Sequence, residues 1–284
     1  MLRLFHHFIS IVRNPQTIAL MPFENNVAWI TGASSGIGEA LAYALSNRGA
    51  KLILSSRREE ALKEVKEKCA GDPAHIQVLP LDLAATDTLE KKAQQALDRY
   101  GDIDYLFNNG GISQRSLAVD TNFEVLRKVM EVNFFGSVAL TKALLPSMIE
   151  RQSGHIVVTS SVMGKFGTRL RSSYAASKHA LHGYFDSLRQ EVHEHNIRVT
   201  LVCPGFVKTD VTRNMLEGDG SRHNKMGKGQ QDGLSPDAFA EKLLPKISRG
   251  KNEIYIGGKE IVGVYLKRWA PGLLNKLLLK SDVT

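Results

Sequence analysis

The chain has 284 residues, of which 43% are apolar and 23% charged, so it can bury a large core and is not expected to be disordered. Its formal net charge of +8 favours anionic partners, such as phosphorylated cofactors, nucleic acid or an anionic membrane surface, without choosing among them. Cys69 and Cys203 lie far apart and at no metal-ligand spacing, which excludes a disulfide framework and indicates buried free thiols in a reducing compartment such as the cytoplasm.

Residues 1–22 are predicted to form an N-terminal extension. Its apolar stretch is shorter than the run of about 18 residues expected of a membrane span, and His6 and His7 interrupt it, which also disfavours a signal peptide. Met21 opens a segment that leads into the first strand, so residues 1–20 are interpreted as an accessory segment or a misassigned start. N-terminal sequencing of the native protein distinguishes the two.

Short apolar runs alternate with amphipathic stretches of helical period through the rest of the chain. Strands that alternate with helices pair in parallel through right-handed crossovers. The sequence therefore predicts an α/β fold, a doubly wound Rossmann-type sheet of seven parallel strands with helices on both faces, in a single domain over residues 23–260. Strands are expected at 27–31, 51–55, 76–81, 104–108, 155–160, 198–203 and 253–257, and helices at 36–48, 58–69, 86–100, 121–149, 174–195 and 235–249.

A glycine-rich turn, TGASSGIG, joins the first strand to the first helix. Glycines permit a tight turn and let backbone amides approach a pyrophosphate, while the helix N-terminus supplies the positive end of a dipole. The turn therefore predicts a dinucleotide site. Its residues are Thr31, Gly32, Ser34, Ser35, Gly36, Ile37 and Gly38.

The end of the second strand indicates which dinucleotide is preferred. An acidic residue there would bind the adenosine ribose hydroxyls and select NAD, whereas arginine accommodates a 2′-phosphate. Ser56 stands at the acidic position and Arg57 and Arg58 follow it. NADP(H) is therefore favoured over NAD(H), with the alternative that the arginines only begin a solvated helix face.

Two segments near the C-terminus break the alternation of strands and helices. Residues 208–234 hold five glycines and few periodic apolar positions, which predicts a lid over a functional site. Residues 261–284 form an amphipathic tail in which leucines and Trp269 stand beside lysines. Such a tail fits an anionic membrane surface, or a helix packed against the domain or a partner subunit.

Several motifs in the same order resemble those of the short-chain dehydrogenase/reductase family over about residues 25–260. Beyond the glycine-rich turn they comprise Asp82, Asn108-Asn109-Gly110-Gly111, Asn133, Ser161, Tyr174-x-x-x-Lys178 and Pro204-Gly205 followed by Thr209. The stretches NNGGISQRS, MIER and SKHAL further resemble the member-7-like branch of dehydrogenase/reductases. Relatives in that branch are often associated with membranes and act on lipophilic carbonyls.

The resemblance implies roles for four catalytic residues. Ser161, thirteen positions before the tyrosine, would hold the substrate oxygen. Tyr174 would be the general acid or base, and Lys178 the cation that favours its phenolate and binds the nicotinamide ribose. Asn133 would anchor a water that links Lys178 to solvent, although outside this motif set an ordinary buried polar residue is the simpler interpretation.

The resemblance also implies cofactor and substrate contacts. Asp82 and Leu83 would meet adenine, Asn109 and Gly110 would line the wall near the adenosine ribose, and the family's usual alanine is replaced by Gly111. The nicotinamide carboxamide would be held after Pro204 and Gly205 by Val207 and Thr209. Candidate substrate-pocket residues are Ser161, Gln114, Arg115, Met163, Tyr174 and Phe206.

The sequence thus predicts an NADP(H)-dependent oxidoreductase that transfers hydride between nicotinamide and a carbonyl or secondary alcohol. The alternative is a cofactor-binding redox sensor or regulatory protein without turnover. No metal is expected, because His193 and His195 lie on different faces of a helix, and no nucleic acid, because the basic charge is spread out. We also expect the protein to form a homodimer or homotetramer. Peripheral membrane contact is expected through the tail.

Overall fold

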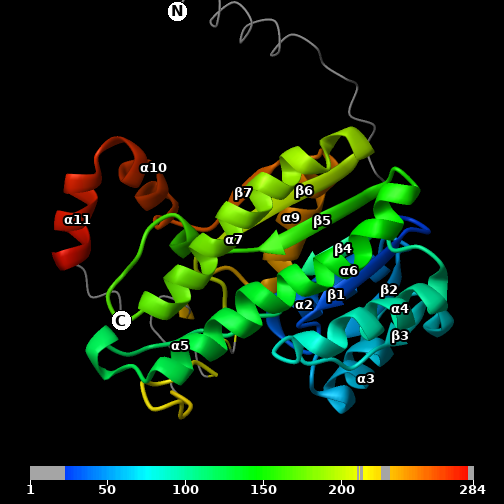
Figure 1. The fold of residues 1–284 in the computed structure, drawn as a ribbon, viewed down its shortest axis with the longest axis horizontal. Helices are drawn as coiled ribbons and strands as arrows, with labels where there is room; N and C mark the ends of the chain where they lie inside the picture. The colour runs from blue at the N-terminus through cyan, green and yellow to red at the C-terminus, as the bar shows by residue number, and fades with distance from the viewer. Residues whose placement is uncertain (1–22, 210, 212–213, 225–230, 281–284) are drawn as a thin grey trace, which may run out of the picture.

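The computed structural model describes residues 23–209, 211, 214–224 and 231–280. The predicted extension over residues 1–22 and part of the predicted lid lie outside this range. Seven parallel strands form one sheet in the order β3-β2-β1-β4-β5-β6-β7, which confirms the predicted Rossmann-type architecture (Figure 1). The strands are β1 (Val27–Thr31), β2 (Lys51–Ser55), β3 (Ile76–Val78), β4 (Tyr105–Asn108), β5 (Gly154–Thr159), β6 (Ile197–Pro204) and β7 (Glu253–Ile256).

Strand β3 is shorter than the predicted range of 76–81. Proline has no N–H and cannot donate to a ladder, so Pro80 prevents a regular strand from continuing. The backbone nevertheless stays beside β2, because Leu79 and Leu81 donate to the carbonyls of Leu54 and Ser56 at 3.0 and 3.1 Å. The loop after β3 is thereby held at the carboxyl edge of the sheet.

Nine α-helices lie in the described residues, close to the predicted ranges. The predicted helix over 121–149 is interrupted by a π-helical turn, η4 (Glu131–Phe135), and Asn133 lies in that turn. The tail forms two helices. The α-helices are α2 (Gly36–Ser46), α3 (Glu59–Lys68), α4 (Leu89–Tyr100), α5 (Phe123–Met130), α6 (Gly136–Glu150), α7 (Ser172–Glu191), α9 (Pro236–Ser248), α10 (Ile261–Trp269) and α11 (Pro271–Lys280).

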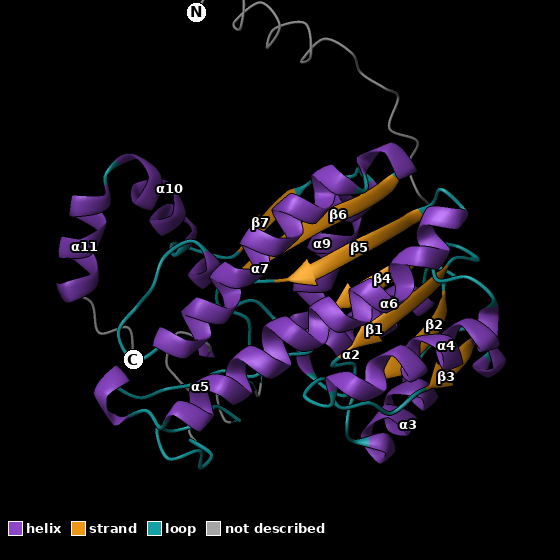
Figure 2. Ribbon diagram, in the orientation of Figure 1, coloured by secondary structure: helices purple, strands orange, loops and turns teal. Residues whose placement is uncertain are grey.

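Helices cover both faces of the sheet (Figure 2). Side chains alternate along β1, so Ala28 and Ile30 pack against α2 and α9 while Trp29 packs on the opposite face with α4, α6 and α7. Because both faces are covered, every residue of β1 is buried. A parallel sheet of this kind places its polar strand ends together at the carboxyl edge.

The continuous helix Phe123–Glu150 is long and apolar enough to cross a membrane by length and composition. It contains α5, η4 and α6, and it packs against α4, α7 and β5 within the domain. Its buried positions include Leu140, Leu144 and Met148. A core helix passes the same test, so this helix alone indicates no membrane span.

The tail helices α10 and α11 project from one end of the molecule (Figure 1). One face of the tail docks on the domain, where Leu274 packs with Val162 and Phe166 in a small apolar cluster. Packing against the domain, one of the predicted alternatives, is therefore present. The opposite side of the tail remains exposed at Trp269 and Leu279.

Candidate active site

The carboxyl ends of β1 and β4 are joined by Thr31. Its Oγ1 accepts hydrogen bonds from the backbone N–H groups of Asn109 and Gly110 at 3.0 and 2.9 Å, and donates to the Phe107 carbonyl at 3.2 Å. Asn109 Nδ2 in turn donates to the Thr31 carbonyl at 3.1 Å. These bonds hold the glycine-rich turn and the Asn109-Gly110 wall together as one rigid surface.

Glycine is required within the turn because the backbones approach closely. Gly32 has a φ of +67°, and a Cβ there would lie 2.8 Å from Gly110 Cα. A Cβ on Gly38 would lie 2.3 Å from the Gly32 carbonyl oxygen. The start of α2 is therefore pressed against the end of β1, with its N-terminus available to a phosphate group.

A cavity of about 470 Å³ opens beside this turn. Its walls include Ser35 and Gly36 from the turn and Thr209 from the predicted lid. Thr209 lies over the turn, since a Cβ on Gly36 would be 3.0 Å from Thr209 Cγ2. The backbone cradle and the cavity fit the diphosphate of a dinucleotide, as the sequence predicts.

Arg58 is folded onto the glycine-rich turn. Its Nη2 donates to the Ser34 carbonyl and lies within hydrogen-bond distance of Ser34 Oγ, both at 3.1 Å. Ser56 Oγ accepts from the Arg58 backbone N–H at 3.1 Å, and the Arg57 side chain is exposed. The Arg58 guanidinium and the Ser34 hydroxyl thus lie together at the end of β2. An adenosine ribose bound at this strand end would place its 2′-phosphate next to them.

Asp82 and Leu83, the residues predicted to contact adenine, lie near the Asn109-Gly110 wall. Their positions do not by themselves define a binding site for a particular base. Asp82 Oδ1 accepts from the Ala84 N–H at 3.0 Å and so shapes the loop after β3. Leu83 is buried against Gly110, because a Cβ on Gly110 would lie 2.6 Å from Leu83 Cδ1. The loop therefore forms an apolar wall beside Gly110.

Ser161 and Tyr174 are brought together at the end of β5. A hydrogen bond from Ser161 stabilises the phenolate form of Tyr174, and Ser161 Oγ accepts from the Met163 N–H at 3.1 Å. The neighbouring Ser160 points elsewhere, with its Oγ 3.0 Å from His182 Nε2 and 3.3 Å from the Lys178 carbonyl. Of the two serines in this stretch, Ser161 is the one beside the phenol.

Lys178 lies one helical turn after Tyr174 and is buried. Its Nζ donates to the Thr159 carbonyl at 2.7 Å and lies 5.7 Å from the centroid of the Tyr174 ring. Burial lowers the pKa of Lys178 to about 8. The ammonium is thus held at the centre of the site and loses its proton more readily than an exposed lysine.

Burial, a hydrogen bond and nearby charge act on the Tyr174 phenol. Burial raises the pKa of Tyr174 above its ordinary value, and the Ser161 hydrogen bond and the positive charge of Arg171 oppose that rise. Lys178, to which the sequence assigns the opposing charge, has its Nζ 5.7 Å from the centroid of the Tyr174 ring while it donates to the Thr159 carbonyl. Its role as the cation that favours the phenolate stays a prediction.

Asn133 connects the π-helical turn to the rest of the site. Its Oδ1 accepts from the Ile112 N–H at 2.8 Å, and its Nδ2 donates to the Ile112 carbonyl and to Ser177 Oγ, both at 2.9 Å. A Cβ on Gly111 would lie 3.1 Å from Asn133 Oδ1 and 3.6 Å from Lys178 Nζ. Asn133 and Lys178 therefore flank the same short backbone segment, which places the predicted water anchor next to the predicted ammonium.

The candidate substrate-pocket residues fall into two groups. Gln114 is 0% exposed; its Nε2 donates to Ser116 Oγ at 2.7 Å, while its buried Oε1 has no hydrogen-bond partner among the described residues. Its place in the substrate pocket stays a prediction. Met163 and Phe206 are partly exposed; Met163 lies two residues after Ser161, and Phe206 follows Pro204-Gly205. The backbone of Arg115 is tied to the lid, because its N–H donates to the Leu216 carbonyl at 2.8 Å.

Glu260 is a site residue for which the sequence offers no signal. Its Oε1 accepts from the backbone N–H groups of Phe206 and Gly258, both at 2.8 Å. The carboxylate therefore fixes the loop after Pro204-Gly205, where the nicotinamide is expected. Because it lies 54 residues after Phe206, only the folded chain reveals this contact.

A polar cluster is formed by the buried His182 and Cys203 and the partly exposed Glu253, whose potential ligand atoms are within 4.8 Å of one another. Sequence spacing gives no sign of it. Lys165 Nζ lies 2.6 Å from Glu253 Oε1, so the carboxylate already has a cationic partner. We interpret the cluster as a polar network that positions Ser160.

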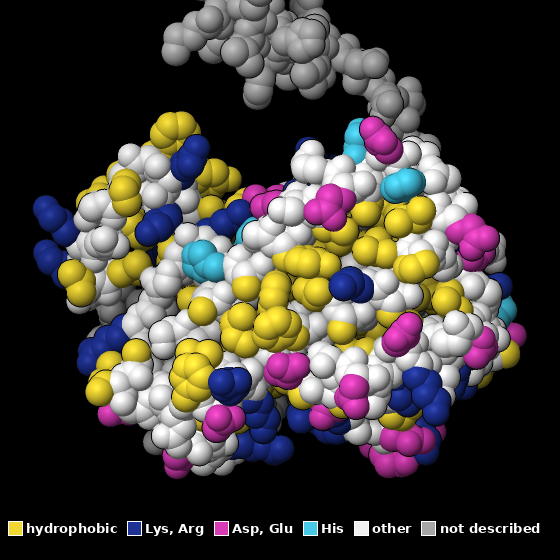
Figure 3. Space-filling view, viewed as in Figure 1, with side chains coloured by type: hydrophobic (Ala, Val, Ile, Leu, Met, Phe, Trp, Pro, Cys, Tyr) yellow, Lys and Arg dark blue, Asp and Glu magenta, His cyan; other side chains and the backbone are white. Residues whose placement is uncertain are grey.

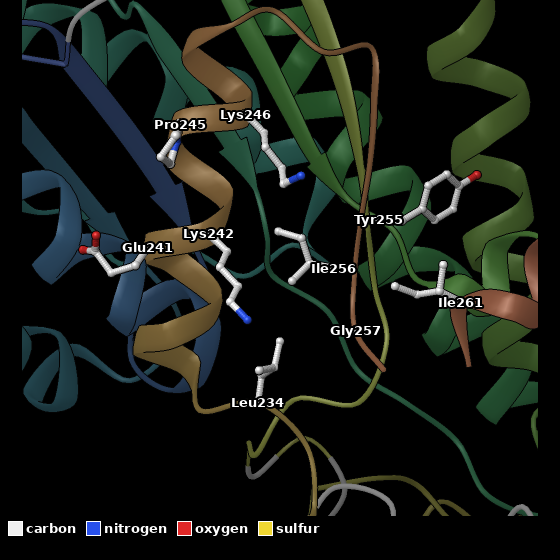
Figure 4. Close-up of a pocket in the computed structure, with 9 residues that line it drawn as sticks. All are labelled: Leu234, Glu241, Lys242, Pro245, Lys246, Tyr255, Ile256, Gly257 and Ile261. Atoms are coloured by element: carbon white, nitrogen blue, oxygen red, sulfur yellow. The ribbon is translucent and has the colours of Figure 1, made fainter. Parts of the chain in front are cut away.

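A second hollow of about 410 Å³ lies between α9 and β7, away from Tyr174 and the glycine-rich turn. Lys242 and Lys246 extend from α9 toward it, and Tyr255 and Ile261 stand on its other side (Figure 4). None of the predicted catalytic or cofactor-binding residues lines this hollow.

Comparison with known proteins identifies the relatives of this chain. A family model described as short chain dehydrogenase matches residues 26–220. The chain is 42% identical over 284 residues to a Drosophila melanogaster protein named Dehydrogenase/reductase SDR family protein 7-like, an alignment that covers 97% of this chain and 87% of the relative.

Solved structures agree with that result. A short-chain dehydrogenase from Streptomyces avermitilis superposes with a TM-score of 0.78 at 29% identity, covering 92% of this chain and 100% of the other. An alcohol dehydrogenase from the archaeon Thermococcus sibiricus, complexed with 5-hydroxy-NADP, superposes with a TM-score of 0.72 at 26% identity, covering 84% and 98%. The match extends over nearly the whole described sheet and its helices.

Proposed function

Because this chain belongs to the short-chain dehydrogenase/reductase family, we propose that it is an NADP(H)-dependent oxidoreductase acting on a carbonyl or secondary alcohol. The observation that carries the proposal is the placement of Tyr174 beside Ser161, with Lys178 one turn along the same helix. This group stands at the same edge of the sheet as the glycine-rich turn. A purely regulatory cofactor-binding protein would have no need of an acid/base group there.

The proton chemistry follows from these side chains. A bound nicotinamide supplies or accepts the hydride. Tyr174 donates its phenolic proton to the carbonyl oxygen during reduction and accepts a proton from the alcohol during oxidation. Ser161 holds that oxygen and stabilises its developing negative charge. Lys178 orients the ribose end of the cofactor, and Asn133 keeps the backbone beside Lys178 in place.

Preference for NADP(H) over NAD(H) rests on the end of β2. There Ser56 replaces a carboxylate that would repel a 2′-phosphate. Arg58 is already turned toward Ser34, so little side-chain entropy remains to be lost when it binds a phosphate. Arg57 is exposed beside it and adds a second positive charge.

A substrate screen separates an enzyme from a redox sensor. We expect the protein to oxidise NADPH in the presence of some ketone, aldehyde, quinone or steroid, with NADH a poorer donor. Lipophilic carbonyls are the first choice, because the relatives' branch and the apolar tail both favour them. A protein that binds NADPH tightly yet turns over no member of a broad panel would support the sensor.

The exposed side of the tail supports peripheral membrane contact. Trp269 and Leu279 are 82% and 88% exposed, and Lys267, Arg268 and Lys276 lie among the apolar residues of α10 and α11. Figure 3 shows yellow and dark blue side chains interspersed over these helices. Apolar insertion together with attraction to anionic headgroups is the usual basis of interfacial binding.

We expect the full-length protein to float with vesicles that contain anionic lipid and to stay behind with neutral ones. Replacing Trp269 and Leu279 by serine should abolish flotation, since each large apolar side chain contributes about 1.5–3 kcal/mol on burial. Val119→Ser is the matched control, because Val119 is 87% exposed in the 3-10 turn Ala118–Asp120, outside the tail. Full-length protein that stays in solution with anionic vesicles would contradict membrane contact.

Self-association is the remaining proposal from the family resemblance. A homodimer or homotetramer would be detected by light scattering during size-exclusion chromatography. The exposed Phe123 and Phe135 on the α5–η4 segment are candidates for the contact.

A further inference from the structure

Glu260 lies directly before α10, at the position that caps a helix, yet its side chain makes no capping hydrogen bond there. Its Oε1 accepts instead from the Phe206 and Gly258 N–H groups, both at 2.8 Å. Two glycines leave the space that this oxygen occupies, because a Cβ on Gly205 or on Gly257 would lie too close to it. The carboxylate therefore fills a cradle made of backbone.

Phe206 belongs to a short segment, residues 205–209, which we call the crossing segment. It begins at the end of β6 and reaches the glycine-rich turn, where a Cβ on Gly36 would lie 3.0 Å from Thr209 Cγ2. In the sheet, β5 and β4 lie between β6 and β1, so the crossing covers three strand spacings, about 14 Å. Residues 205–209 reach about 17 Å when fully extended, so the segment has little slack.

The crossing segment is held by hydrogen bonds of two kinds. Gly205 N–H donates to the last residue of β7 at 2.9 Å, Leu234 N–H donates to the Phe206 carbonyl at 3.1 Å, and Lys208 N–H donates to the Leu234 carbonyl at 2.9 Å. These three bonds join backbone groups, whereas the Phe206 N–H depends on the Glu260 side chain. A charged acceptor makes the stronger hydrogen bond, so loss of the carboxylate would loosen the segment at Phe206.

The tail holds Glu260 from the other side. Ile261, the next residue, packs against the apolar cluster of Val162, Phe166 and Leu274. This cluster includes the residue directly after the predicted catalytic serine. The carboxylate is therefore held between the docked tail and the crossing segment, which fixes its orientation.

The order of the strands separates the two halves of a bound dinucleotide. Strand β2, with Arg58 beside Ser34, lies on one side of β1, whereas β5 and β6 lie on the other side. A dinucleotide with its diphosphate at the glycine-rich turn and its reacting ring beside Tyr174 therefore extends its nicotinamide half from β1 toward β5. The crossing segment runs along the same stretch of the carboxyl edge.

We infer that Glu260 is a positioning residue for the nicotinamide half of the dinucleotide, because it keeps the crossing segment in place beside that half. The inference rests on the proposed function, since it requires a nicotinamide dinucleotide at this edge. The carboxylate itself takes no part in hydride or proton transfer, and the phosphorylated adenosine would bind on the far side of β1. Loss of Glu260 should therefore weaken the contribution of the nicotinamide half alone.

The first test compares two probes by titration calorimetry of the full-length protein. They are NADPH and 2′-phospho-ADP-ribose, which keeps the phosphorylated adenosine and the diphosphate but lacks the nicotinamide ring. Glu260→Ala should raise the Kd for NADPH about tenfold and the Kd for 2′-phospho-ADP-ribose by at most about twofold. Glu260→Gln retains an acceptor oxygen and should restore most of the affinity for NADPH. Lys259→Ala is the matched control, because it shortens an exposed side chain one residue earlier, and it should change neither Kd.

The second test examines the contact without a nucleotide. The Phe206 and Gly258 amides should both exchange hydrogen faster in Glu260→Ala than in the parent protein, whereas Lys259→Ala should exchange like the parent. If Glu260→Ala does not fold, Glu260→Asp replaces it in both tests. Its shorter side chain withdraws the oxygen from the two amides, so the same selective loss of NADPH affinity is expected.

These measurements separate the inference from the proposed function. Parent protein that binds neither probe would contradict the proposed function, and hydrogen exchange would still show whether Glu260 holds the crossing segment. Parent protein that binds both probes, together with equal losses for the two in Glu260→Ala or an unchanged Kd for NADPH, would overturn the inference.

Discussion

Replacing Tyr174 by phenylalanine should lower the turnover number for carbonyl reduction by about a thousandfold while NADPH still binds with nearly its original affinity. The phenol hydroxyl is the proton donor in the proposed reaction, and no other described side chain beside Ser161 can replace it. The ring itself stays, so the packing at the start of α7 is preserved. Steady-state kinetics and NADPH fluorescence titration measure the two quantities separately.

Tyr184→Phe is the matched control for this experiment. It removes a hydroxyl from the same helix, ten residues further on, where Tyr184 packs edge-on against Phe134 and Phe185. We expect near-normal turnover from it. If Tyr174→Phe reduced carbonyls as fast as the parent protein, Tyr174 could not be the acid, whatever the substrate.

Exchange of Arg57 and Arg58 for glutamine should raise the KM for NADPH by about 10- to 100-fold and change the KM for NADH by a few-fold at most. The difference arises because only NADPH carries a phosphate for Arg58 and Ser34 to bind. Hydrogen bonds to a charged group are stronger than neutral ones, and arginine can make two at once. The preference for NADPH over NADH, as a ratio of kcat/KM values, is the measured quantity.

The two single variants show how much each arginine contributes to the rise in the KM for NADPH. Arg58→Gln should account for most of it, because Arg58 already contacts Ser34, whereas Arg57 is exposed without a hydrogen bond to the turn. Arg249→Gln serves as the control, since it removes an exposed positive charge between α9 and β7. Equal losses for NADPH and NADH in the double variant would show that the arginines are only a solvated helix face.

The sheet and the glycine-rich turn could be predicted from sequence because their signals are local. Apolar runs of strand length, such as 27–31, are followed at once by the turn they lead into. The order of the strands was not predicted and comes from the structure. Strand β3 ends earlier than predicted because of a single residue, Pro80.

The catalytic residues are predicted from a motif set, whereas the hydrogen bonds around them come only from the fold. Tyr174 and Lys178 share one face of a helix, which made Lys178 the obvious cation. Its orientation toward the Thr159 carbonyl depends on how α7 packs on β5, which the spacing does not contain. The hydrogen bond from Lys178 to Thr159 therefore required the folded structure, while the role of Lys178 as the cation beside Tyr174 stays a prediction.

Long-range contacts explain the other differences. Glu260 meets Phe206 and Asn133 meets Ser177 only after the segments between them fold. Carboxylates and amides of this kind look like ordinary surface residues in the sequence. Their positions show that side-chain hydrogen bonds, to backbone at Phe206 and to a side chain at Ser177, help to hold the segments around the site.

The most direct test of the central claim is to follow hydride transfer itself. NADPH that carries deuterium on the transferred face of the nicotinamide is incubated with the full-length protein and a carbonyl substrate found by the screen, and the alcohol is analysed by mass spectrometry. We predict one carbon-bound deuterium per molecule of product, formed by the parent protein and lost with Tyr174→Phe. NADPH binding without deuterium in any product, across ketones, aldehydes and steroid ketones, would contradict the claim that this site catalyses carbonyl reduction.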